Sequence, residues 1–300
     1  MTTSTSRLRA GQLVRGWRQQ RRLSQLELSL RTSVSTRYLS CVETGKATPS
    51  RQLLLFLAAE LDIPLRDRNV LLLAAGYAPK FGEASVDGTA LAPARAALAR
   101  LLASHEPFPA VVIDGRWNVM QRNASAAALT AGVAAELARP PINVLRSALH
   151  PAGLAPRIAN FAEWSGYLLG RLRRQIDISG DPGLVELDRE VRGYPHVRAA
   201  EPDGPHDIFV PLQIRYRGTD ITLLNTLTVF GAPLDASLAD LVLESFHPAD
   251  AHTAEVLRQA ADERAVPEEP TTKGADRAGS TSTAQRATSR RRTTRARRDA

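Results

Sequence analysis

Apolar residues in the first quarter of the chain recur at intervals of three and four, which predicts a series of short amphipathic helices. The inward-facing positions of the first three helices are Leu13, Val14, Trp17, Leu28, Leu39 and Val42. Ser24 precedes Glu27 by three residues, the spacing of a capping box, so a second helix is expected to begin there. Ser35 is expected to cap a third helix, and Gly45 to end it in the left-handed conformation that glycine adopts most easily.

Two more helices complete this N-terminal pattern. The pair Pro49-Ser50 predicts the start of a fourth helix, Pro64 breaks that helix, and a fifth follows. We therefore predict an all-α, five-helix domain over residues 8–78. The next stretch is rich in Gly, Ser and Asp, and it predicts a linker over residues 79–90.

Beyond the linker the pattern changes from helical to mixed. A helix from Ala92 ends near Pro107, and two short apolar runs then flank Asp114-Gly115, a strong signal for a β-hairpin. The expected strands lie at 110–113, 117–120, 208–216, 221–230 and 237–246, and the further helices at 124–130, 158–176 and 251–260. This order predicts an α+β domain over residues 91–262, with an antiparallel sheet and helices on one face.

The net charge of +8 is concentrated at the two ends of the chain. Residues 1–76 hold 12 Lys and Arg against 5 Asp and Glu, residues 271–300 hold 9 against 2, and the stretch between them is acidic. Basic ends around an acidic middle predict that the ends meet a polyanion. Residues 266–300 have almost no large apolar side chain, so we expect a disordered basic tail. The six arginines within residues 290–298 either add nonspecific attraction to phosphate or are solvated without a selected role.

Several classes of function are not supported by the sequence. The apolar runs are too short to span a bilayer, no signal-peptide pattern opens the chain, and the single cysteine, Cys41, allows no intrachain disulfide. We therefore expect a cytoplasmic protein with no membrane partner. The chain lacks a Gly-x-Ser-x-Gly elbow, a Gly-rich phosphate loop and a His-Glu-x-x-His zinc helix. His247 and His252 are five residues apart, which does not place them on one helix face. We expect no catalytic residues, no metal and no cofactor.

The segment Ser24–Gly45 carries the most specific pattern in the chain. Two short helices flank a turn of three to four residues, and the small Ser29 lies where the second and third helices approach most closely. The positions expected to pack these helices together are Leu28, Val34, Leu39 and Val42. The exposed face of the third helix then holds Thr36, Arg37, Ser40 and Cys41. Such a helix fits the major groove of double-stranded DNA.

This segment resembles the Cro/repressor-type (XRE family) helix-turn-helix, through Gln25, Glu27, Leu28 and the ending Glu43-Thr44-Gly45. The DNA contacts that the resemblance implies are Gln25 on phosphate, Thr36, Arg37, Ser40 and Cys41 on base edges, and Thr44 and Lys46 on the DNA backbone, with Ser35 at the start of the helix. Arg37 either reads a guanine or holds a phosphate. Ser33 stands where the family usually has glycine, which predicts a modest cost for a positive φ.

The rest of the chain resembles the ligand-binding domain of MmyB-like regulators. The stretches that carry the resemblance are His105–Ala110, Trp117–Val119, Asn123–Ala124, Asn143–Leu145, Leu149–Pro151, Glu244–Asp250 and, before the linker, Leu72–Tyr77. Together with the helix-turn-helix, the similarity covers about residues 8–260. It implies a PAS-like fold for a sensor domain and an association with fatty-acyl ligands.

A fatty-acyl ligand would need a slot between sheet and helices, lined by aliphatic and aromatic side chains. The candidate lining residues are Val112, Trp117, Phe161, Trp164, Leu168, Phe209, Leu227 and Phe246. The same side chains equally suit an ordinary hydrophobic core. Arg157 or Arg171 would receive a ligand carboxylate, whereas Asn118 and Asn123 are more typical of turn and cap residues.

We expect a homodimer whose two third helices enter successive major grooves of a pseudo-palindromic operator, about 34 Å apart. A ligand in the sensor domain would change the relative placement of the two reading helices. The main alternative keeps the DNA-binding domain but assigns the second domain to a protein partner in place of a small ligand. An RNA-binding or antitoxin-type protein is a third alternative that no sequence feature favours.

Overall fold

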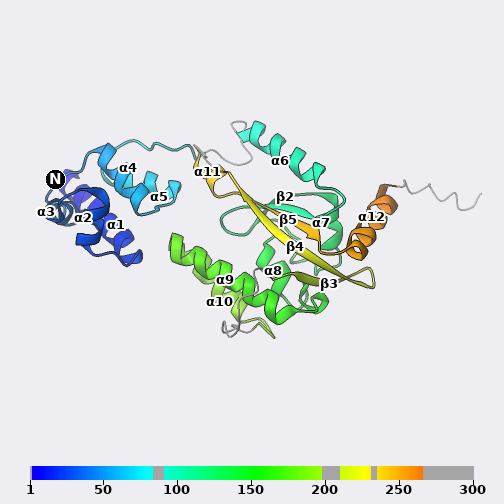
Figure 1. Cartoon of the computed structure of the whole chain (residues 1–300). Coiled ribbons are helices and arrows are strands. Elements are labelled where there is room, and N and C mark those ends of the chain that lie inside the picture. Colours follow the sequence, from blue (N-terminus) through cyan, green and yellow to red (C-terminus); the bar gives the residue numbers. More distant parts are fainter. Residues whose placement is uncertain (1, 84–90, 198–209, 231–234, 266–300) are drawn as a thin grey trace, which may run out of the picture. The chain divides into compact units, whose positions relative to one another are not determined.

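The structure is a computed structural model that describes residues 2–83, 91–197, 210–230 and 235–265 (Figure 1). Residues 2–83 form the five helices that the apolar spacing predicts. They are α1 (Thr2–Gln20), α2 (Gln25–Thr32), α3 (Thr36–Glu43), α4 (Arg51–Glu60) and α5 (Leu65–Ala74). The largest fully buried side chains of their shared core are Leu28, Leu39, Leu54, Leu57, Leu61, Ile63, Leu71 and Leu72. This part of the chain therefore has a hydrophobic core of its own.

Serine caps determine where three of these helices begin. Ser24 Oγ accepts the N–H of Glu27 at 3.1 Å, and the Glu27 carboxylate accepts the N–H of Ser24 at 2.6 Å, so the predicted capping box is confirmed. Ser35 and Ser50 cap α3 and α4 by accepting the N–H three residues further on. Each cap satisfies a donor that the helix itself leaves unpaired.

The chain around α3 depends on two residues in the left-handed region and on one close approach. Ser33, between α2 and α3, has a φ of 57°, so the strained conformation predicted for this serine is present. Gly45 has a φ of 75°, although α3 itself ends earlier, at Glu43. A Cβ on Gly11 of α1 would lie 2.2 Å from the carbonyl oxygen of Val42, so glycine is required where α1 crosses the end of α3.

The second region combines helices with an antiparallel sheet. Its helices are α6 (Ala92–Ser104), α7 (Ala124–Leu129), α8 (Val144–Leu149), the 3-10 turn η2 (Ala155–Arg157), α9 (Phe161–Ser179), α10 (Pro182–Arg192), α11 (Ala236–Ala239) and α12 (Ala251–Ala265). Its strands are β1 (Ala110–Ile113), β2 (Val119–Arg122), β3 (Leu212–Tyr216), β4 (Thr219–Val229) and β5 (Val242–Pro248), in the order β2-β1-β5-β4-β3 (Figure 1). Neighbouring strands are antiparallel throughout, which confirms the predicted α+β class.

The turn of the β1–β2 hairpin is longer than the Asp-Gly signal predicts. Asp114 Oδ1 accepts the backbone N–H groups of Arg116 and Asn118, each at 2.8 Å. Trp117 adopts a left-handed φ of 66°. β2 therefore begins at Val119, two residues later than predicted, because a short polar side chain that bonds its own turn competes with strand pairing.

The structure corrects the prediction of one strand and adds two helices. The predicted strand at 237–246 is in fact α11 followed by β5, which begins at Val242. The predicted strand at 208–216 corresponds to β3 from Leu212, and its first two residues lie outside the described residues. The pattern did not predict α8, which has only 6 residues, or α10. Arg217-Gly218 joins β3 to β4 with positive φ at both residues, as a two-residue type I′ hairpin loop requires.

Helices cover both faces of the sheet, and not one face as predicted. Along β1, Val112 packs with Leu98 and Leu102 of α6, whereas Val111 belongs to the larger core that includes side chains of α7, α8 and α9. Because successive side chains of a strand point to opposite faces, α6 covers one face and α7–α9 the other. This arrangement buries all of β1.

Two predictions fall on residues that the structure does not describe: the disordered tail over 266–300 and, for residues 84–90, the linker. Among the described helices, none combines the length and apolar character needed to cross a membrane.

Candidate DNA-reading surface and ligand cavity

The predicted reading face of α3 is open to solvent. Arg37 is exposed on this face. The other predicted base-edge residues, all partly buried, are Thr36, Ser40 and Cys41. The predicted residues at the ends of the helix, all exposed, are Ser35, Thr44 and Lys46. On the opposite side Leu39 and Val42 are fully buried. α3 is thus anchored along one face and presents a polar face, as a groove-binding helix must.

A buried ion pair holds the end of α3 against α1. Arg18 donates from Nε and Nη2 to the two carboxylate oxygens of Glu43, at 2.7 and 2.9 Å. Burial raises the pKa of Glu43, but the hydrogen bonds from Arg18 and Gln25 outweigh it, so that pKa lies below its usual value. Glu43 is therefore charged near neutral pH, and the pair fixes the position of the reading helix.

Two residues predicted to bind the DNA backbone also bond within the protein. Gln25, the first residue of α2, donates from Nε2 to Glu43 at 2.8 Å. Its amide nitrogen carries a second N–H, so a phosphate contact remains possible in this conformation. Thr44 Oγ1 donates to the carbonyl of Ser40 at 2.7 Å, so its single hydroxyl proton reaches a phosphate only if this bond breaks. Both DNA contacts stay predictions.

The second region contains an apolar cavity of about 250 Å³ between the sheet and the helices α7, α8 and α9. The apolar strand side chains in its wall are Val111, Val119, Leu212 and Phe246. The helical side chains include Leu129, Val144, Ala148, Trp164 and Leu168. The loop after α7 completes the wall with Val133, Leu137, Ala138 and Ile142. The site is therefore built mainly from aliphatic side chains.

The structure places three of the eight predicted lining residues in this wall: Trp164, Leu168 and Phe246. Val112 packs with α6 on the opposite face of the sheet, because the inward side chain of β1 is its neighbour Val111. Trp117 is buried in the main core, Phe161 is partly buried against it, and Leu227 is 45% exposed; none of these three lines the cavity. Phe209 lies outside the described residues.

Three charged groups at or near the cavity, Glu244, Arg171 and Arg157, already have partners within the protein. Arg171 Nη1 lies 2.8 Å from Glu244 Oε1, which also accepts from Asn225 at 2.9 Å. The guanidinium of Arg171 stacks over the Trp117 ring at 4.6 Å from its centroid. Arg157 donates to the backbone carbonyls of Ala131 and Arg215. The two arginines predicted to receive a ligand carboxylate therefore serve the protein's own groups.

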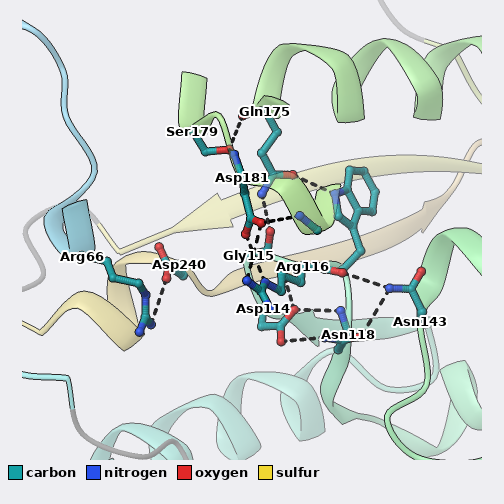
Figure 2. A network of polar contacts seen from close by, with 12 residues as sticks. Arg66, Asp114, Gly115, Arg116, Asn118, Asn143, Gln175, Ser179, Asp181 and Asp240 are labelled. Carbon is teal, nitrogen blue, oxygen red and sulfur yellow. Dashed lines mark hydrogen bonds and ion pairs between the residues drawn. The ribbon is translucent and has the colours of Figure 1, made fainter. Parts of the chain in front are cut away.

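A polar network joins the β1–β2 turn to two helices of the cavity wall (Figure 2). Asn143, the cap of α8, donates to the carbonyl of Arg116 at 2.9 Å and to Oδ1 of Asn118 at 3.2 Å. Gln175 of α9 accepts the indole N–H of Trp117 at 2.7 Å. The turn thus sets the spacing of α8 and α9.

The predicted turn and cap roles of Asn118 and Asn123 are confirmed. Asn118 bonds Asp114 within the turn, and Asn123 Oδ1 accepts the N–H of Ala126 at 2.9 Å to cap α7. The sequence reading missed Glu244 and Ser147, which both line the cavity. A lone acidic residue within a predicted strand was the available signal for Glu244, whereas a serine in a short helix gives none. In the described ranges no three His, Cys, Asp or Glu side chains are placed to share a metal ion.

A helix-turn-helix with one solvent-facing helix, followed by a region with its own core and an apolar cavity, defines a DNA-binding transcription regulator with a ligand-binding part. Residues 94–260, more than half of the chain, match the family of the MmyB-like transcription regulator ligand binding domain. Residues 14–67 match the Helix-turn-helix family. The chain therefore belongs to the MmyB-like transcription regulators, and the resemblance drawn from the sequence is confirmed.

Other comparisons add little. A search of curated proteins gave no match. A solved structure described as "Structure of an RNA-binding Light-Oxygen-Voltage Receptor" is similar over 88% of this chain and 65% of that chain, with 16% identity and a TM-score of 0.23. This chain thus covers less than two thirds of that protein, and a likeness at this level carries no conclusion about function.

Proposed function

We propose that this protein is a sequence-specific transcription regulator whose affinity for double-stranded DNA responds to a small apolar, fatty-acyl-like ligand. Residues 8–78 would read the operator and residues 91–262 would sense the ligand, with the PAS-like fold that the resemblance implies. The observation that carries the proposal is a polar, solvent-facing helix and an apolar cavity in one chain. Binding to the chromosome supports a cytoplasmic location.

The charge distribution supports DNA binding. Residues 1–76 carry 12 basic against 5 acidic side chains, enough to attract the phosphate backbone before any base is read. Sequence preference then depends on the base-edge positions of α3, where Arg37 is the exposed charged residue. We therefore assign positioning to the surrounding polar residues and specificity to the face of α3.

We propose that two copies bind together. One helix-turn-helix covers one half-site, and dimeric proteins of this kind place their reading helices about 34 Å apart on one side of the duplex. A homodimer doubles the recognised sequence without a second reading motif in the chain. The expected operator is accordingly a pseudo-palindrome.

The cavity supports an apolar ligand. Its volume of about 250 Å³ exceeds the roughly 150 Å³ of an engineered apolar cavity that binds benzene. Each buried methylene contributes about 0.8 kcal/mol, so a chain of roughly eight carbons provides useful affinity before ordering costs are subtracted. A fatty-acyl-like chain fits both the aliphatic wall and the size.

The ligand acts on DNA binding only through its different affinities for the two arrangements of the protein. Helices α8 and α9 are among the elements that line the cavity, through Ala148, Trp164 and Leu168. We propose that filling the cavity shifts these helices and that this movement reaches the reading helices of the dimer.

One observation favours a second candidate, in which this domain docks a protein partner. The end of β4 exposes a row of apolar side chains, Leu227, Val229 and Phe230, at 45, 61 and 38%. Exposed apolar patches often mark protein interfaces. A partner bound at this strand would make the small ligand unnecessary for regulation.

Native mass spectrometry and DNA footprinting test the proposal together. The protein purified from its own cells is expected to carry an apolar molecule that leaves on denaturation, and footprints are expected to show two symmetric half-sites. Operator affinity is then measured with and without saturating fatty-acyl compounds. If the purified protein carries no apolar molecule and none of the fatty-acyl compounds changes its DNA affinity, the docking candidate is favoured. An asymmetric footprint would exclude the dimer.

A further inference from the structure

Ser147 of α8 stands out among the polar groups of the cavity wall. Its side chain is 6% exposed, and within the described residues its Oγ is the one buried side-chain oxygen or nitrogen without a hydrogen-bond partner. A buried hydroxyl that loses its bonds to water without replacement destabilises the folded state. Such a group needs an explanation, and its position in a cavity supplies one.

Several other hydroxyls in or at the end of helices bond the preceding turn of their own helix. Thr130 Oγ1 donates to the carbonyl of Ala126 at 2.9 Å, and Ser179 Oγ donates to that of Gln175 at 2.8 Å. Serine and threonine in helices commonly make this bond to the preceding turn. Ser147 has the carbonyl of Asn143 one turn before it, which accepts the Ser147 backbone N–H at 2.9 Å, but its hydroxyl makes no such bond. The hydroxyl is left for a molecule inside the cavity.

The remaining polar groups of the wall limit the charge that this molecule can carry. Glu244, 1% exposed, contributes its carboxylate to the wall, whereas its ion-pair partner Arg171 is not among the lining residues. Arg122 is exposed and donates to Thr130 at 3.1 Å. A ligand carboxylate in the interior would therefore meet a like charge at Glu244, and its natural cation, Arg171, is engaged.

We propose that the cavity binds an apolar molecule that carries a neutral oxygen-bearing group, such as a hydroxyl, ketone or ester, and that Ser147 Oγ is its hydrogen-bond partner. This inference rests on the proposed ligand-binding function and names the ligand class. A hydroxyl both donates and accepts, so Ser147 serves each of these groups. A free fatty acid lacks the neutral group and brings a charge.

The test compares three probes of similar size on the full-length protein by calorimetric titration: 1-octanol, octanoate and butylbenzene. The wild type is expected to bind octanol at least tenfold more tightly than octanoate. Ser147→Ala is expected to lower the affinity for octanol about tenfold, the effect of losing one hydrogen bond. Its affinity for butylbenzene is expected to stay within about twofold of the wild-type value. Ser147→Thr, which keeps the hydroxyl, is expected to retain the preference for octanol over octanoate.

A second readout separates a ligand-binding hydroxyl from a structural one. Ser147→Ala removes an unpaired group, so the ligand-free protein is expected to melt at the same or a higher temperature. The matched control is Ser165→Ala in α9: Ser165 is fully buried but donates to the carbonyl of Ala162 at 3.1 Å. This variant is expected to melt lower while binding octanol normally.

The possible outcomes are distinct. If no probe binds the wild type, both the ligand-binding function and this inference are overturned. If octanol and butylbenzene bind, but Ser147→Ala leaves both affinities unchanged or lowers both by the same factor, the cavity is a ligand site and the proposed role of Ser147 is wrong. If octanoate binds most tightly, the neutral ligand class is wrong. A lower melting temperature for Ser147→Ala with unchanged binding would make the serine structural.

Discussion

Replacing Arg18 with methionine tests how the reading helix is held in place. Arg18 bonds both carboxylate oxygens of Glu43, at 2.7 and 2.9 Å, and the two side chains are 10 and 2% exposed. Methionine keeps most of the apolar stem but removes the charge, so the carboxylate stays buried with the Gln25 amide as its remaining hydrogen-bond donor in the described part of the chain. Removing one partner of a buried pair costs roughly 3–5 kcal/mol.

That cost is a large share of the roughly 5–15 kcal/mol that stabilises a typical domain. Helices α1–α3 are therefore expected to open much more often in Arg18→Met, and operator affinity to fall with them. The matched control is Arg146→Met. Arg146 makes the same two-point contact with Glu190, at 2.8 and 2.7 Å, but these side chains are 41 and 39% exposed. An exposed pair contributes roughly 0–1 kcal/mol.

Hydrogen exchange followed by mass spectrometry measures local opening in the whole chain. Protection is expected to drop in peptides from α1–α3 of Arg18→Met and to change little around α8 and α10 of Arg146→Met. The double variant Arg18→Met/Glu43→Leu is expected to recover most of the stability, because it leaves no buried charge. If Arg18→Met lowers protection in its own region no more than Arg146→Met does around α8 and α10, the reasoning is refuted.

The same pair predicts a pH dependence with a defined sign. Burial raises the pKa of Glu43, but the bonds from Arg18 and Gln25 lower it by more. The folded pKa therefore lies below the ordinary value of 4.5. Such a carboxyl stabilises the fold at pH above its unfolded pKa, and this stabilisation is lost as the pH falls through the lower, folded pKa. The protection factors of α1–α3, which compare observed with intrinsic exchange rates at each pH, are expected to fall below about pH 4.5, and Glu43→Gln is expected to flatten that acid limb.

Three further predictions concern the DNA-reading face, the cavity entrance and the turn network. Arg37→Ala is expected to weaken operator binding by roughly 1–3 kcal/mol and to relax the preference at one base pair; an equal loss on all sequences would assign Arg37 to phosphate. Ala138 is exposed and lines the cavity, so Ala138→Trp is expected to weaken ligand binding more than tenfold and to change the melting temperature little. Ala135→Trp, in the same exposed loop but outside the cavity wall, is expected to change neither ligand binding nor melting temperature. Asn143→Ala is expected to lower the free energy of urea unfolding by about 1–2 kcal/mol through the lost α8 cap, and Asn143→Asp, which keeps the capping oxygen, to recover part of it; equal losses would contradict the capping role.

Several features of the reading domain were predictable because they depend on neighbours in the chain. Ser24 and Glu27 form their capping box within one turn, and Ser35 caps α3 through a residue three positions on. The exposed face of α3 follows from its period of 3.6 residues. The excess of basic residues in 1–76, which is counted directly from the sequence, also indicated DNA binding. The buried bond between Arg18 and Glu43 was not predictable, since it joins residues 25 positions apart.

In the second region, the local sequence pattern did not predict the turn geometry or the residues of the cavity wall. The hairpin signal at Asp114-Gly115 was correct in kind, but the bonds of Asp114 lengthened the turn, so β2 begins two residues later than predicted. The bounds of β1 were predicted correctly, but the sequence did not say which face of this fully buried strand borders the cavity, and the lining residue is Val111 in place of Val112. An aromatic residue such as Trp117 looked like a ligand contact, yet it packs beneath Arg171.

By itself the sequence determined the helix-turn-helix, its reading face, the mixed class of the second region and the family, because caps, periodicity and short motifs act over a few residues. Only the tertiary structure decided which side chains surround the cavity, which charges neutralise each other and that the hydroxyl of Ser147 has no partner among the described residues. Those properties arise where strands and helices distant in the chain are packed together, and a hydrogen bond is made or left unmade by distances that no local pattern records.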